Sequence, residues 1–174
     1  MLKDFDLDYQ NSLITLDNNS DNSVNSDNSD NLLGTTDYFL TDLAKKLKFK
    51  NFRGVFMRDE LSRINQPYKQ ESGIMNFDTS VNPGSHWVAW YKINDKQLYY
   101  FDSYGTAVPD ELRNYLSGIN NIKKPKILHS DFMIQGLTTD ICGELCCAFI
   151  YLMDYSGLSY KDVIRHLNER DDRR

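Results

Sequence analysis

The stretch HWVAWYKINDKQLYYFD, residues 86–102, decides how this sequence folds. Two runs rich in aromatic and apolar residues flank the polar residues 94–96, a pattern typical of a β-hairpin. If residues 94–96 form a three-residue loop, Asp102 lies opposite Val88 and becomes the diagonal neighbour of His86. A two-residue loop would shift the register by one and turn Asp102 to the other face. A close pair of His86 and Asp102 therefore requires the odd loop or a bulge.

Further strands and helices can be placed on both sides of this hairpin. Alternating or continuous apolar residues predict strands at 4–10, 52–57, 73–77, 86–93, 97–102 and within 126–135. Helical periodicity and capping residues predict helices at 35–48, 109–116, 142–155 and 158–167. Thr36 or Asp37 is expected to cap the first helix, and Ser159 the last. This order predicts an α+β fold in which helices flank a mixed β-sheet.

Composition divides the 174 residues into a folded domain and an N-terminal extension. Residues 17–31 are a run of Asn, Ser and Asp with four acids and no base, which predicts a disordered linker. The linker separates residues 1–16, a candidate docking strand, from one domain at 32–174. Of the net charge of −5, residues 1–16 carry −2 and the linker −4, which leaves +1 for the domain. A nearly neutral domain argues against nucleic acid as a strong partner.

The compartment is predicted from the N-terminus and the cysteines. The acidic start MLKDFDLDYQ lacks the apolar core of a signal peptide. The longest apolar run, residues 145–153, is about half as long as a membrane span. Three cysteines this close together cannot staple a small secreted fold. We expect a soluble, intracellular, reduced protein without a membrane partner.

All three cysteines lie in CGELCC, residues 142–147. A nucleophilic cysteine reacts as its thiolate, and the free N–H groups and dipole of a helix N-terminus favour that anion. Cys142 lies where the predicted helix begins, although core packing is an equally good interpretation of the local segment. Cys146 and Cys147 lie inside the apolar run and are expected to pack in the core. A zinc site is disfavoured because no second cysteine pair or paired histidine follows at a suitable spacing.

A catalytic cysteine also needs a base, and the chain has three histidines. His86 opens a predicted strand at the edge of a loop, where a substrate could reach it. His166 lies among charged residues of the last helix and is expected on the surface. His129 lies at a strand end without a clear partner.

An orienting acid and an oxyanion donor would complete the site. Asp102 is the candidate acid by the hairpin register, while a turn cap before SYG is its alternative role. Asp131 and Asp140 remain competing acids. Gln135 precedes Cys142 by a short loop, so its side-chain amide could join the Cys142 backbone N–H in an oxyanion hole.

Four motifs, HWVAWY, YYFDSYG, IQGLTTDICG and CGELCCAF, occur in this order and resemble the superfamily of adenovirus protease and SUMO/ubiquitin-like proteases. The Gln–Gly and Cys–Gly pairs, and the double cysteine that follows, look most like adenovirus protease. The broader run over residues 51–105 is similar to maturation proteases of virophages and polinton-like viruses. The resemblance covers about residues 35–155. It implies a papain-like/adenain-like fold with the nucleophile at a helix N-terminus.

The resemblance also implies roles for individual residues. The four catalytic roles fall on Cys142 as nucleophile, His86 as general base, Asp102 as orienting acid and Gln135 in the oxyanion hole. Trp87 matches a tryptophan that roofs a narrow substrate channel, which admits small residues such as glycine, although core packing is an alternative for it. Gly143 would let backbone come close beside the nucleophile.

The implied function is a cysteine endopeptidase that uses no cofactor and acts as a monomer on viral capsid precursor proteins. It would work in the virion and in the cytoplasm of the infected cell. One alternative is a protease that removes ubiquitin-like modifiers, and another is a non-enzymatic virion component with a vestigial site.

Activation is where the sequence departs from adenovirus protease. That enzyme is activated by a peptide held through a disulfide, with a cysteine outside the active-site helix. This chain has no cysteine outside residues 142–147, so the same linkage is not expected. Residues 4–10, tethered by the linker, are a candidate replacement that would add a strand to the sheet.

Overall fold

The computed structural model describes residues 11, 35–118, 125–131, 133–134 and 140–171. The elements in chain order are α2 (Asp37–Lys46), β1 (Phe52–Phe56), the 3₁₀ helix η1 (Arg58–Ser62), β2 (Glu71–Asn76), β3 (Trp87–Asn94), β4 (Gln97–Phe101), α3 (Asp110–Ser117), β5 (Ile127–Leu128), α4 (Cys142–Tyr155) and α5 (Tyr160–Asp171). The predicted strand at 4–10 and the predicted linker at 17–31 lie outside the described residues. Within the described part, every helix is too short or too polar to cross a bilayer.

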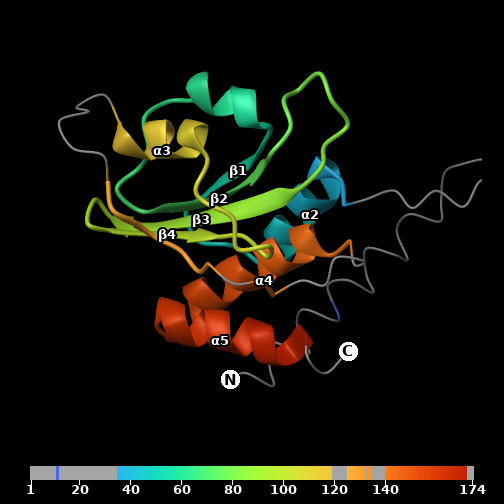
Figure 1. Ribbon diagram of the computed structural model, residues 1–174, viewed down its shortest axis with the longest axis vertical. Coiled ribbons are helices and arrows are strands. Elements are labelled where there is room, and N and C mark those ends of the chain that lie inside the picture. The colour runs from blue at the N-terminus through green and yellow to red at the C-terminus, as the bar shows by residue number, and fades with distance from the viewer. Residues whose placement is uncertain (1–10, 12–34, 119–124, 132, 135–139, 172–174) are drawn as a thin grey trace, which may run out of the picture.

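The five strands form one mixed sheet in the order β1-β2-β3-β4-β5 (Figure 1). β1 runs parallel to β2, and β4 runs parallel to β5. β3, in the middle, is antiparallel to both β2 and β4. A parallel pair needs a crossover connection. The first crossover contains η1, which was not predicted, and the second contains α3. The predicted α+β class, a mixed sheet flanked by helices, is confirmed.

Helices cover both faces of the sheet. Trp87 and Ala89 pack in one core cluster with residues of α2, α4 and α5, whereas Val88 and Trp90 pack in another with residues of η1 and α3. Successive side chains of a strand point to opposite faces, so these two clusters lie on opposite sides of β3. The cysteine helix α4 is therefore separated from α3 by the sheet (Figure 1).

The β3–β4 hairpin has the register that a close pair of His86 and Asp102 requires. Ala89 lies opposite Phe101, as the three-residue loop predicted. Near the turn, however, Asn94 pairs with Gln97, and a register shift lies between Lys92 and Asn94. The turn is thus a two-residue loop, and the bulge beside it restores the register along the rest of the hairpin.

The helix bounds follow local sequence signals. The Thr36 hydroxyl accepts a hydrogen bond from Phe39 N at 3.2 Å and caps α2, as predicted. The Ser159 hydroxyl accepts one from Asp162 N at 3.3 Å at the start of α5. α4 covers the predicted residues, and Gly157, with φ of 70°, follows its C-cap in a left-handed conformation that glycine adopts readily.

Candidate active site

His86 lies immediately before β3, where the sheet ends. Its backbone carbonyl accepts a hydrogen bond from Phe77 N at 2.9 Å, which extends the pairing of β2 with β3. The imidazole meets the Phe77 ring edge-on at a centroid distance of 5.1 Å and the Tyr104 ring at 4.6 Å with a 30° tilt. The residue is 7% exposed, so backbone and ring contacts together fix its orientation.

The loop that leads into His86 is closed by Asn76, which is buried. Asn76 Oδ1 accepts hydrogen bonds from Asp78 N at 2.9 Å and from Ser85 N at 3.0 Å, at the two ends of this loop. Gly84 has φ of +99°, and a Cβ there would lie 3.0 Å from Asn76 Nδ2. Glycine suits this position for both reasons.

Asp102 follows β4 directly and is 1% exposed. Its Oδ1 lies 2.6 Å from His86 Nε2 and accepts a hydrogen bond from Tyr104 N at 2.8 Å. Its Oδ2 accepts from Thr106 N at 3.0 Å and from the Thr106 hydroxyl. Burial alone would raise the pKa of Asp102, but these bonds outweigh burial and lower the pKa below its ordinary value. Asp102 is therefore an ionised, fully oriented partner of the imidazole.

The imidazole of His86 is correspondingly basic. Burial lowers its pKa, but hydrogen bonding and charge interactions with Asp102 and Cys142 outweigh burial and raise the pKa from 6.5 to about 9. The ring is therefore protonated at neutral pH. Its Nδ1 is buried and forms no hydrogen bond of normal geometry with any described residue, although the Cys142 side chain is near enough to affect the ring. Loose geometry of this kind is common before a substrate binds.

Cys142 is the first residue of α4 and is 4% exposed. The preceding residue, Ile141, provides no side-chain cap for the helix. The helix therefore presents its N-terminal N–H groups and the positive end of its dipole near the thiol, which favours a negative charge there. α4 packs against β3, and this contact brings Cys142 to His86 at the end of the sheet.

The other two cysteines have a different environment. Cys146 and Cys147 are fully buried in the core cluster, as predicted. Burial raises the pKa of both thiols well above the ordinary value, which keeps them neutral. Of the three thiols, Cys142 is the one beside a protonated imidazole.

The remaining candidate residues of this site lie as follows. Trp87 is buried in the core cluster of α4, and its indole N–H donates to the Thr35 carbonyl at 2.7 Å. Gly143 is also buried, and an added Cβ would lie 2.7 Å from Thr35 Cγ2 and 2.9 Å from Leu40 Cδ2. Both residues thus have packing roles, and their substrate contacts stay predictions. Gln135 lies outside the described residues.

The alternative bases and acids lie elsewhere. His129 is exposed, and its Nδ1 lies 3.1 Å from the carbonyl oxygen of Ser130. His166 is half-buried on α5. Asp131 and Asp140 are exposed, whereas Asp102 makes the bond to His86.

Several residues that shape the site were missed by the sequence analysis: Phe77, Asn76, Tyr104, Thr106 and Thr35. Tyr104 lies inside the motif YYFDSYG, and Thr106 comes two residues later, so a turn folded back on Asp102 could have been suspected. Thr35 had no signal in the sequence, because its partners are 52 and 109 positions away.

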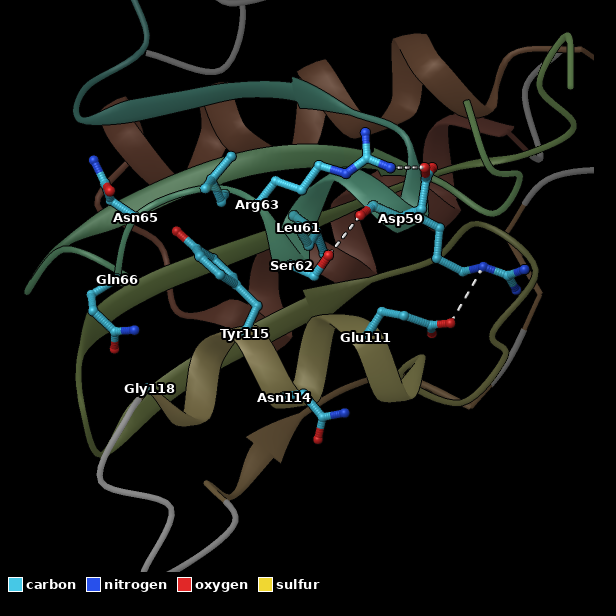
Figure 2. A pocket seen from close by; sticks show the side chains of 12 residues that line it. Asp59, Leu61, Ser62, Arg63, Asn65, Gln66, Glu111, Asn114, Tyr115 and Gly118 are labelled. Atoms are coloured by element: carbon cyan, nitrogen blue, oxygen red, sulfur yellow. Dashed lines mark hydrogen bonds and ion pairs between the residues drawn. The ribbon is translucent and has the colours of Figure 1, made fainter. Parts of the chain in front are cut away.

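A cavity of about 510 Å³ lies between η1, the loop after it and α3 (Figure 2). Its lining includes two ion pairs, Arg63 with Asp59 at 3.2 Å and Arg58 with Glu111 at 3.5 Å. No cysteine or histidine is among its lining residues in the described chain. The elements around it cover the sheet face opposite α4, so this cavity is separate from the candidate active site.

A thiol at a helix start, a protonated imidazole and an ionised carboxylate form an arrangement capable of nucleophilic catalysis. Within the described residues, no group of three or more potential ligands is placed to hold a metal ion. Searches against protein-family models and against curated proteins found no match to this chain. The function of the protein is therefore inferred from the geometry of this site and from the sequence motifs.

Proposed function

We propose that this protein is a cysteine endopeptidase with an adenain-like, papain-like arrangement of its site. The observation that carries the proposal is the 2.6 Å contact between His86 Nε2 and Asp102 Oδ1, with Cys142 beside the same imidazole at the start of α4. Core packing alone would not require a charged pair at this place, since burying charges is costly.

In the first half of the proposed reaction, Cys142 Sγ attacks the carbonyl carbon of the scissile peptide bond as a thiolate. The negative charge that develops on the carbonyl oxygen is stabilised by the Cys142 backbone N–H and the Gln135 side-chain amide. His86 then gives its proton to the leaving amine, and a thioester with Cys142 remains. Asp102 keeps the imidazole oriented throughout.

In the second half, water hydrolyses the thioester. His86, now neutral, takes a proton from the attacking water, and Cys142 leaves as the thiolate. This transfer restores the imidazolium. The raised pKa of His86, about 9, supports its role as the acid of the first half, because it keeps the proton-donating form populated at neutral pH.

The proposed substrates are viral capsid or other structural precursor proteins, cut beside small residues such as glycine. Support comes from the order and wording of the four motifs, which are most similar to viral maturation proteases. Trp87 and Gly143 are the proposed substrate-side residues of the channel.

The test is mass spectrometry of a capsid precursor co-expressed with this protein or with its variants. Wild-type protein should shorten the precursor, and Cys142→Ala should leave it intact. Cys147→Ala is the matched control, since it removes a thiol from the same helix without touching the proposed site. Full processing by Cys142→Ala would overturn the proposal. Cleavage of a modifier fusion but not of the capsid precursor would instead favour a deconjugating protease.

A further inference from the structure

Thr35 connects two segments that carry the candidate catalytic pair. Its carbonyl accepts the hydrogen bond from Trp87 Nε1 at 2.7 Å, and its hydroxyl donates to Glu144 Oε2 at 2.9 Å. Trp87 follows His86 directly in the chain, and Glu144 is two residues after Cys142. One residue thus holds the start of β3 and the first turn of α4.

Packing reinforces these two bonds. An added Cβ on Gly143 would lie 2.7 Å from Thr35 Cγ2, so the threonine is in close contact with the residue that follows Cys142. The same added Cβ would lie 2.9 Å from Leu40 Cδ2, and Leu40, one turn into α2, is fully buried. The start of α2 is therefore pressed against the start of α4.

We propose that Thr35 is a positioning residue of the candidate active site, which fixes the separation of His86 and Cys142 through its bonds to Trp87 and Glu144. Neither of these bonded residues takes part in the proton transfers. Trp87 and Glu144 instead fix the backbone positions from which the His86 and Cys142 side chains extend. A shift of α4 relative to β3 would change the contact between the Cys142 side chain and the His86 imidazole, and small displacements of this kind reduce catalysis strongly.

This inference rests on the proposed function, because positioning of His86 and Cys142 matters only if the two residues react together. It can nevertheless be tested without a substrate. The rate of Cys142 alkylation by iodoacetamide at pH 6 is measured on the full-length protein by mass spectrometry, which separates Cys142 from the other two cysteines. At this pH an ordinary thiol is almost wholly protonated and reacts slowly.

The first variant is Thr35→Val, which keeps the β-branched shape and the carbonyl but loses the hydroxyl. Its alkylation rate should fall roughly three- to tenfold, the range expected for one lost hydrogen bond. Thr35→Ser keeps the hydroxyl and should restore most of the rate. In a Glu144→Ala background, Thr35→Val should have no further effect, because its partner is already absent.

The matched control is Thr36→Val, the same substitution one residue later. Thr36 caps α2 through Phe39 N, so its variant tests whether loss of helix stability alone slows Cys142. We expect it to keep the wild-type alkylation rate, even where thermal melting shows an equal loss of stability. Equal slowing by both variants, or an unchanged rate in Thr35→Val, would overturn the proposal.

Peptide cleavage by the same variants separates this proposal from the proposed function. A positioning role predicts that Thr35→Val lowers kcat and leaves KM near the wild-type value. If wild-type protein cleaves no peptide while the alkylation pattern holds, the proposed function fails and the positioning role stands. If cleavage occurs and Thr35→Val changes neither kcat nor alkylation, the positioning role fails alone.

Discussion

At the scale of single residues, one short loop, residues 102–106, positions both the Asp102 carboxylate and the His86 imidazole. Residues 102–106 supply the carboxylate that bonds His86, the backbone and hydroxyl donors that hold this carboxylate, and the Tyr104 ring that contacts the imidazole. The Asp102 carboxylate therefore accepts the hydrogen bond from His86 in a fixed orientation. Cys142, by contrast, reaches the pair from a helix 40 residues later in the chain.

The protonation of His86 gives the first prediction. Its pKa of about 9 in the folded protein lies above the ordinary 6.5, so its contribution to stability is complete below about pH 6.5 and is lost as the pH rises through about 9. Asp102→Asn should lower the pKa, because burial then acts against a weaker partner. NMR titration of the His86 ring in both proteins checks this, and a wild-type value near 6.5 would contradict it.

The Thr106 hydroxyl gives the second prediction. The hydrogen bond from the Thr106 hydroxyl helps to lower the pKa of Asp102, so Thr106→Val should raise that pKa. On acidification, the ion pair of Asp102 with His86 should then be lost at a higher pH than in the wild-type protein. NMR titration of the Asp102 carboxyl carbon in both proteins measures the shift, with Thr106→Ser as the control that keeps the hydroxyl. An Asp102 titration in Thr106→Val that matches the wild-type titration would count against this role.

At the scale of elements, the hairpin and α4 were predictable because their signals are local. Alternating residues and a short polar turn defined the hairpin, and the requirement for a bulge followed from counting residues between His86 and Asp102. The bulge arose beside the turn because the two-residue loop alone gives the wrong register. η1 was not predicted, because RDELS lacks the length and periodicity of an α-helix.

The contact between α2 and α4 gives the third prediction. Gly143→Ala places a methyl group 2.7 Å from Thr35 Cγ2 and 2.9 Å from Leu40 Cδ2, so the start of α4 or these two side chains must shift. We expect a loss of about 1–3 kcal/mol in the free energy of unfolding, as for other overpacked core positions. Thr35→Ser removes the closest atom, so Gly143→Ala should cost less in that background. Urea denaturation of the four proteins measures the coupling, and equal costs in both backgrounds would contradict the contact.

At the scale of the whole molecule, the sheet separates the layer that holds the candidate active-site helix α4 from a supporting layer that contains η1 and α3. The supporting layer is tied to β2 by Glu71, which is 2% exposed. Its Oε1 accepts hydrogen bonds from Trp90 Nε1 and from the Tyr115 hydroxyl, both at 2.9 Å, and its Oε2 accepts from Tyr68 N at 2.7 Å. Arg53 Nε lies 3.7 Å from the same carboxylate. The sequence did not indicate this network, because Glu71 and Tyr115 are 44 positions apart.

The division into layers gives the fourth prediction. Glu71→Gln should lower the free energy of unfolding by roughly 1–3 kcal/mol, because it replaces an acceptor of several buried donors. Glu111→Gln is the matched control, since its pair with Arg58 is exposed and should be worth less than about 1 kcal/mol. Both folded variants should alkylate Cys142 at the wild-type rate. A slowed rate in Glu71→Gln would show that the two layers are coupled.

We propose that Cys142 is an activated nucleophile because His86 and Asp102 lie beside it. The most direct measurement is the rate at which iodoacetamide alkylates Cys142 at pH 6 in wild-type protein and in His86→Ala, read by mass spectrometry. We predict that wild-type Cys142 reacts much faster than an ordinary thiol at this pH, and that His86→Ala slows the reaction at least about tenfold. Equal, slow alkylation of Cys142 in both proteins would contradict the account and identify Cys142 as a packing residue.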